Sequence, residues 1–256
     1  MKAKLDNIAV VLRSPRFPEN IGAAARAMRN MGLNRLIVVE PELPDMERMC
    51  KMATHEARDI IESMRVCTAL DDALGEFNYI VGTTARLGGL RQTLRTPRTM
   101  AEELAPLSHE NQIALLFGPE DRGLTNEDLR FCHMLVNIPT FEFKSLNLAQ
   151  AVMVLCYEIF NAASDKAAPT TPKMANRHEL DAMYAGLKET LIDIDFINAE
   201  NPDYFMFNIR QAFNRLKLKS REVQLIRGLI RQVNWYGKKR YADGLTDGQK
   251  AAKTED

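Results

Sequence analysis

Three short segments hold most of the residues in this chain whose types and spacing could support chemistry. Residues 20–26 read NIGAAAR, residues 118–124 read GPEDRGL, and residues 145–152 read SLNLAQAV. Glycine lets the backbone approach a ligand closely, while carboxylate, amide, hydroxyl and guanidinium groups bind and orient polar ligands. The segments therefore predict a single ligand site if the fold brings them together.

Short apolar runs next to these segments predict the strands that position them. Such runs, bounded by turn residues, occur at residues 7–12, 36–39, 79–83, 113–117 and 134–138, which is typical of buried strands. Between the first two runs, Asn20 is placed to cap a helix that ends near Met31. Strand, helix and strand in this order predict a parallel α/β sheet. Such sheets bind ligands at the carboxyl ends of their strands.

Taken together and in this order, the three segments resemble the sequence motifs of the SPOUT superfamily of S-adenosylmethionine-dependent RNA methyltransferases. Within that superfamily the chain is similar to the TrmJ branch, which methylates the ribose 2′-oxygen of a tRNA anticodon-loop nucleotide. The resemblance covers residues 7 to about 236. It implies an α/β, parallel-sheet domain with a C-terminal trefoil knot at residues about 80 to 160. It also implies a homodimer, S-adenosylmethionine as methyl donor, and a tRNA substrate methylated on the pyrimidine at position 32.

The resemblance further implies roles for individual residues. It places Arg26, Asn20, Glu120, Ser145 and Asn147 in the catalytic site. It places the cofactor against Thr83, Thr84, Ala85, Gly118, Ile138, Ser145, Leu146 and Asn147. Because a guanidinium stays protonated in proteins, we expect Arg26 to bind phosphate and stabilise the developing alkoxide rather than to act as a base. Helix capping remains an alternative role for Asn20 and Ser145, and Glu120 could be an ordinary carboxylate at a helix entrance.

A change in composition separates the C-terminal part of the chain. Residues 162–175 read AASDKAAPTTPKMA and lack apolar periodicity, which is typical of a linker. We therefore expect a SPOUT domain at residues 1–163 and a linker at 164–175. A small all-α extension should follow at 176–241, with a disordered polar tail at 242–256.

Basic residues are concentrated in the expected helical extension. Between Phe205 and Tyr241 the chain has ten Lys or Arg residues and one acidic residue, Glu222. This excess predicts contact with RNA phosphates, although a solvated helix face is the simpler alternative. Residues 84–98 form a second basic stretch, expected as a polar loop. The predicted RNA-binding residues are Arg13, Arg86, Arg91, Arg210, Lys217, Arg221, Arg227 and Arg231.

Several classes of protein are disfavoured. The net charge is zero, and no apolar run reaches the roughly 20 residues of a membrane span. The four cysteines form no CxxC pair, so we expect no metal site and reduced thiols in a cytoplasmic protein. A dinucleotide-binding GxGxxG after a strand and a P-loop GK[ST] are both missing from the sequence. Two alternatives remain open: a ribosomal RNA ribose 2′-O-methyltransferase and a non-catalytic RNA-binding module.

Overall fold

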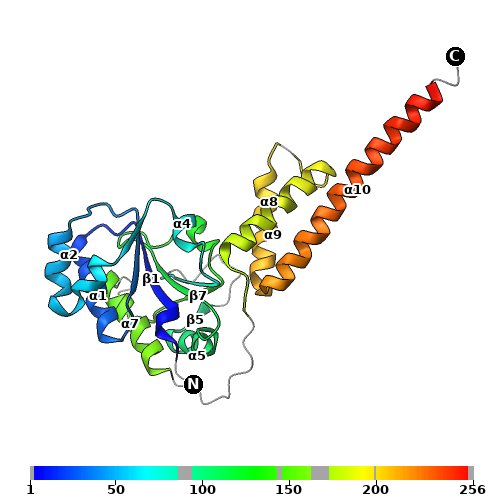
Figure 1. Cartoon of the computed structure of the whole chain (residues 1–256). Helices are drawn as coiled ribbons and strands as arrows, with labels where there is room; N and C mark the ends of the chain where they lie inside the picture. The colour runs from blue at the N-terminus through cyan, green and yellow to red at the C-terminus, as the bar shows by residue number, and fades with distance from the viewer. Residues whose placement is uncertain (1–2, 86–93, 143–145, 163–172, 199, 253–256) are drawn as a thin grey trace. The chain divides into compact units, whose positions relative to one another are not determined.

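A computed structural model describes residues 3–85, 94–142, 146–162, 173–198 and 200–252 (Figure 1). The chain divides into two compact units, Met1–Arg177 and His178–Asp256. The first unit is α/β and the second consists of helices. None of the helices in these ranges is long and apolar enough to span a membrane.

The first unit is built on a sheet whose described strands are all parallel, in the order β3-β2-β1-β6-β4-β7-β5. The central strands are buried on both faces, which explains why they read as continuous apolar runs. The strands are β1 (Ile8–Arg13), β2 (Arg35–Val39), β3 (Arg65–Cys67), β4 (Tyr79–Thr83), β5 (Leu94–Arg95), β6 (Ile113–Phe117) and β7 (Met134–Val136). The predicted parallel α/β fold is confirmed, while β3 and β5 are too short to have given a sequence signal. The knot implied by the resemblance stays a prediction.

Helices cover both faces of this sheet (Figure 1). Ile8, Val10 and Leu12 of β1 face one core, and Ala9 and Val11 face the other. The first core is closed by α1 (Pro18–Asn30), α2 (Met46–Ala53), α3 (Arg58–Glu62), α5 (Pro97–Leu107) and α7 (Leu148–Asn161), and the second by α4 (Leu70–Leu74) and α6 (Asn126–Leu129). The alternation of strand side chains therefore divides the apolar residues between two layers of helices.

Three helices differ from the sequence expectations in where they begin. Helix α1 starts at Pro18, with Phe17 as its N-cap residue, because proline needs no N–H partner in the first turn. Asn20 is therefore inside the helix, and its side chain is free for other contacts. Helix α7 is capped by Asn147, whose side chain accepts a hydrogen bond from the backbone N–H of Ala149. Helix α5 begins inside the stretch expected to be loop, after a Thr96–Thr99 capping box.

The second unit contains α8 (Arg177–Asp193), α9 (Pro202–Leu216) and α10 (Ser220–Ala252). Helix α10 continues past residue 241, so the part of the expected disordered tail up to Ala252 is helical. A helix extends easily once its first turn has formed. The expected linker lies mostly outside the described residues, but its described end is packed: Met174 and Ala175 are buried.

The close packing of α1 on α2 depends on Gly22. A Cβ atom at Gly22 would lie 2.1 Å from the carbonyl oxygen of Met49. Although alanine is the better helix former, we expect Gly22→Ala to lower the free energy of unfolding by roughly 1–3 kcal/mol through overpacking. The measurement is denaturant unfolding of the full chain.

Gly186→Ala is the matched control. It makes the same substitution inside α8, where the nearest atom to the added Cβ is Cγ2 of Ile230 at 3.6 Å. We expect this variant to be as stable as the natural chain or more stable. Equal effects of the two substitutions would show that helix propensity, not the α1–α2 contact, determines the outcome.

Candidate functional site

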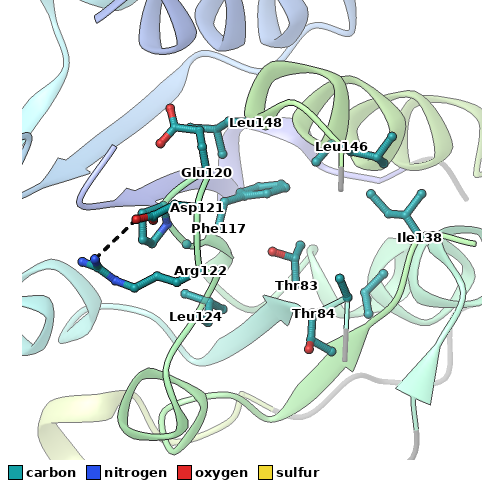
Figure 2. A pocket seen from close by; sticks show the side chains of 16 residues that line it. Thr83, Thr84, Phe117, Glu120, Asp121, Arg122, Leu124, Ile138, Leu146 and Leu148 are labelled. Atoms are coloured by element: carbon teal, nitrogen blue, oxygen red, sulfur yellow. Dashed lines mark ion pairs between the residues drawn. The ribbon is translucent and has the colours of Figure 1, made fainter. Parts of the chain in front are cut away.

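The carboxyl ends of the neighbouring strands β6, β4 and β7 open onto a cavity of about 340 Å³ (Figure 2). Strand ends, the loop after β6, and the start of α7 all contribute to its wall. The lining residues are Thr83, Thr84, Ala85, Phe117, Gly118, Pro119, Glu120, Asp121, Arg122, Gly123, Leu124, Val136, Ile138, Leu146, Leu148 and Ala151. This is the edge at which open α/β sheets bind ligands.

The loop after β6 folds tightly on itself. A Cβ atom on Gly118 would lie 2.2 Å from the carbonyl carbon of Gly123 and 2.3 Å from the backbone nitrogen of Leu124. Gly123 has a φ of +66° and donates its N–H to the carbonyl oxygen of Pro119 at 2.9 Å. Both glycines are therefore required by the loop itself, in addition to any approach of Gly118 to a ligand.

The cavity wall is apolar on one side and polar on the other. Ile138 and Leu146 supply apolar surface on one side, whereas Glu120, Asp121 and Arg122 supply polar groups on the other. The hydroxyl of Thr83 is directed back to the carbonyl oxygen of Leu116, at 3.3 Å. Such a wall suits a small molecule that has an apolar or aromatic part and a polar, positively charged end.

Glu120 joins the three motif segments through hydrogen bonds. Its carboxylate accepts from the side-chain amide of Asn20 at 2.6 Å and from the backbone N–H of Arg16 at 3.0 Å. The amide of Asn147 in turn donates to the side-chain oxygen of Asn20 at 2.9 Å. The starts of α1 and α7 and the loop after β6 are thus held at one point beside the cavity.

The structure brings together most of the residues predicted for the cofactor. Thr83, Thr84, Ala85, Gly118, Ile138 and Leu146 all line the cavity. Asn147 lies instead on an adjoining groove, and Ser145 lies outside the described residues. The sequence interpretation missed Phe117, Leu124, Val136, Leu148 and Ala151, because an apolar cavity wall has the same sequence pattern as a core.

Arg26 is not brought to this cavity. It is exposed on α1 and lines neither the cavity nor the adjoining groove. It has no hydrogen-bond or ion-pair partner among the described residues. Six helical residues separate it from Asn20, which corresponds to about 9 Å along the axis and about 120° around it. The side chains of Arg26 and Asn20 therefore project from different sides of α1.

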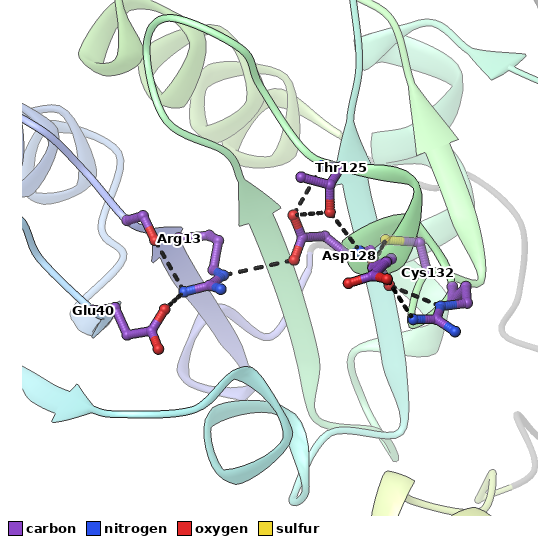
Figure 3. Close-up of polar contacts among 8 residues, drawn as sticks. Arg13, Glu40, Thr125, Asp128 and Cys132 are labelled. Carbon is purple, nitrogen blue, oxygen red and sulfur yellow. Dashed lines mark hydrogen bonds and ion pairs between the residues drawn. The ribbon is translucent and has the colours of Figure 1, made fainter.

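Arg13, predicted to bind RNA, is held by other protein groups (Figure 3). It pairs with Glu40 and with Asp128, whose Oδ1 lies 3.6 Å from its Nε, and it donates to the hydroxyl of Ser14 at 2.9 Å. The same Asp128 carboxylate caps α6 by accepting from Thr125. These pairs fix the ends of β1 and β2 against α6, and a contact of Arg13 with RNA stays a prediction.

The other predicted RNA-binding residues fall into two groups. Arg86 and Arg91 lie outside the described residues. In the second unit, Lys217, Arg221, Arg227 and Arg231 are exposed, while Arg210 lies over the ring of Tyr184, 5.2 Å from its centroid. Because α9 ends at Leu216 and α10 starts at Ser220, Arg210, Lys217 and Arg221 do not share one continuous helix.

Comparison with known proteins agrees with this fold. Residues 7–157 match the SpoU rRNA methylase family, and residues 178–246 match the C-terminal domain of the tRNA methyltransferase TrmJ. The chain is 38% identical over 244 residues to the tRNA (cytidine/uridine/adenosine-2′-O-)-methyltransferase TrmJ of Pseudomonas aeruginosa, covering 90% of this chain and 94% of that one. The crystal structure of TrmJ from Z. mobilis superposes with a TM-score of 0.77 at 28% identity, covering 88% of this chain and 98% of that one.

The parallel sheet, with its cavity at the ends of β4, β6 and β7, is therefore that of a SpoU-type methylase. Since the matches extend through the helical unit, the chain belongs to the TrmJ family within that class. The resemblance inferred from the three sequence motifs is confirmed.

Replacing Asn20 by Asp tests the Asn20–Glu120 hydrogen bond without any substrate. The variant loses the amide N–H donor and places a second carboxylate beside Glu120. Because two neighbouring carboxylates repel each other, the pKa of one of the two carboxyls is higher in the folded variant than in the unfolded chain. Stability is then lost as the pH rises through that raised pKa. We expect the deficit in unfolding free energy to grow between about pH 4 and pH 7, reaching roughly 1–3 kcal/mol.

Asn20→Ala serves as the control, because it removes the same hydrogen bond without adding charge. Its deficit should stay constant over that pH range. A pH-independent deficit for Asn20→Asp as well would contradict the proximity of the two side chains in solution.

Proposed function

We propose that this protein transfers a methyl group from S-adenosylmethionine to the ribose 2′-oxygen of a tRNA pyrimidine, the one at position 32 of the anticodon loop. The observation that carries the proposal is the meeting of the three motif segments at Glu120, at the edge of the cavity. The similarity to TrmJ proteins along the whole chain supports tRNA as the substrate. A tRNA-modifying role also supports the expected cytoplasmic location.

The cavity fits the proposed cofactor. When bound, S-adenosylmethionine supplies an electrophilic methyl group on a positively charged sulfur. A volume of about 340 Å³ lies within the usual range for small-molecule sites. The apolar side chains of Ile138, Leu146 and Leu124 suit an adenine ring, and the Glu120 carboxylate at the polar end suits the cationic end of the cofactor.

The protein's part in the reaction is to position groups and to stabilise charge. Methyl transfer would form a C–O bond at the ribose oxygen, leave the sulfur as a neutral thioether, and release the hydroxyl proton to water or a phosphate oxygen. The hydrogen bonds from Asn147 to Asn20 and from Asn20 to Glu120 hold these three side chains in place at the rim of the cavity. Fixed side chains favour an in-line arrangement of the ribose oxygen and the methyl group. A guanidinium close to the target phosphate lowers the energy of the developing alkoxide, and Arg26 is the residue we assign to that role.

We further propose that two copies of the chain complete each site. Arg26 is exposed and away from its own chain's cavity, so it is available to the cavity of a second copy. Helix α7 packs beside α1 and carries two exposed aromatic side chains, Tyr157 and Phe160, each 52% exposed. A dimer formed through these helices would cover both aromatic side chains and bring Arg26 to the partner's site.

The helical unit supplies the second part of the proposed tRNA-binding surface. Lys217, Arg221, Arg227 and Arg231 are exposed on or next to α10. Their charges fit a phosphate backbone, and binding should weaken with salt because the release of counterions from the RNA becomes less favourable.

The direct test is incubation of the purified protein with methyl-labelled S-adenosylmethionine and total tRNA, followed by mapping of ribose-methylated nucleotides. We expect label on the 2′-oxygen of the pyrimidine at position 32. Label only in ribosomal RNA, label on a base, or no transfer despite cofactor binding would each overturn the proposal.

Arg26 variants test the assigned role of this residue. Arg26→Ala should lower the single-turnover rate by on the order of 10²–10³. Arg26→Lys should also lose most of the rate, because an ammonium keeps the charge but lacks the planar fork that binds phosphate at two points. Cofactor affinity, measured by calorimetry, should stay unchanged. Arg29→Ala, on the same helix, is the control and should keep full turnover.

A mixed dimer tests whether Arg26 acts on the partner's cavity. Ile138→Trp should fill the cavity and abolish cofactor binding, while Ile138→Val should preserve it. Neither the Arg26→Ala dimer nor the Ile138→Trp dimer should methylate tRNA. After the two inactive proteins exchange subunits, activity should return, because each mixed dimer has an intact cavity facing an intact Arg26. Continued inactivity of verified mixed dimers would place Arg26 at its own chain's cavity.

A further inference from the structure

A groove adjoins the cavity at its polar end. Its lining consists of Phe17, Glu19, Asn20, Arg48, Glu120, Leu146 and Asn147. Glu120 and Leu146 line both hollows, so the groove and the cavity meet at these two side chains. A substrate whose reacting atom sits at the rim beside Glu120 would extend its remaining atoms into the groove.

Phe17 is an exposed aromatic side chain on a rigid backbone. It is 48% exposed, although the residues on both sides of it are fixed. The N–H of Arg16 is bonded to the Glu120 carboxylate, Pro18 begins α1, and the carbonyl oxygen of Phe17 accepts the N–H of Asn20 at 3.0 Å. The Arg16 guanidinium lies 5.8 Å from the ring centroid. An aromatic ring held this way is preorganised to stack on a flat ligand.

A donor and an acceptor lie side by side in the same groove. Arg48 pairs with Glu19, with 2.6 Å between Nη2 of the guanidinium and Oε1 of the carboxylate. Both side chains are partly exposed, at 48% and 38%. Each therefore retains hydrogen-bonding capacity toward a ligand, because a guanidinium has five N–H donors and a carboxylate accepts at two oxygens.

We propose that this groove binds the target pyrimidine, with the base stacked on Phe17 and its polar edge directed to the Glu19–Arg48 pair. The inference rests on the proposed function, which places the ribose 2′-oxygen at the rim beside Glu120. An extruded base offers an apolar face and a polar edge, and proteins bind such bases by aromatic stacking together with hydrogen bonds.

This arrangement would allow either pyrimidine to be accepted. Cytosine carries an amino donor at the position where uracil carries a carbonyl acceptor. A groove that presents a carboxylate acceptor beside a guanidinium donor offers a partner to each. The Glu19–Arg48 pair therefore suits a site that admits both bases without selecting between them.

The test is a cycle of two protein forms and two RNAs. The RNAs are a tRNA with its natural pyrimidine at the methylated position and the same tRNA with an abasic ribose there, which keeps the 2′-hydroxyl. On the natural RNA, Phe17→Ala should lower kcat/KM by roughly 5- to 150-fold, the range for loss of one base–aromatic stack. On the abasic RNA the two proteins should react at equal rates. Phe17→Tyr, which keeps an aromatic face, should restore the rate on the natural RNA.

The other results overturn either this inference or the proposed function on which it rests. An equal loss on both RNAs would mean that Phe17 acts on protein structure and not on the base. Dissociation of the dimer by Phe17→Ala, seen by sedimentation, would make the groove a contact between copies of the chain. Failure of the natural protein to methylate any tRNA would instead reject the proposed function, so the two failures are distinguishable.

The contact of the base edge with the Glu19–Arg48 pair is tested separately. Arg48→Met should lower the rate on uridine relative to cytidine, and an unchanged ratio of the two rates would reject this contact.

Discussion

The carboxylate of Glu120 is the contact on which the site depends. It accepts one hydrogen bond from the side chain of Asn20 and one from the backbone of Arg16, and these residues are about a hundred positions away in the sequence. Hydrogen bonds to a charged acceptor are stronger than neutral ones. The carboxylate therefore joins the loop after β6 to the start of α1, and the Asn147–Asn20 hydrogen bond joins the start of α1 to the start of α7.

The sequence predicted the fold and the site region for identifiable physical reasons. The buried strands β1, β4 and β6 are apolar on both faces, so they stand out as continuous runs, and polar segments follow directly at their ends. The boundaries were less accurate. Asn20 reads as a helix cap, but the proline two residues earlier begins α1 and leaves the amide free to bind Glu120.

Other parts of the site have no distinct signal in the sequence. Phe117, Leu124 and Val136 line the cavity, but their apolar side chains are indistinguishable from core residues until the strand order is known. The thiol of Cys132 shows the same limit: it is fully buried, and burial raises its pKa well above the ordinary value, as burial raises the pKa of Cys156 to about 12. Both thiols therefore serve in packing. In the sequence, the only sign of this role was that the cysteines form no CxxC pair.

The segment that ends the first unit determines where this protein can be divided. Asn78 donates to the carbonyl oxygen of Met174, Asn111 accepts the N–H of Met174, and Arg177 lies over the ring of Phe131. Both asparagines are buried at the amino ends of β4 and β6. A fragment cut at residue 163, where the sheet's last helix is already complete, would lose the two hydrogen bonds to Met174, which leaves Nδ2 of Asn78 and Oδ1 of Asn111 unpaired at about 1–3 kcal/mol for each. The other polar atoms of the two amides would keep their bonds to Gln112 and Leu107. The smallest self-sufficient α/β fragment of this chain therefore extends to Arg177, beyond the apparent linker.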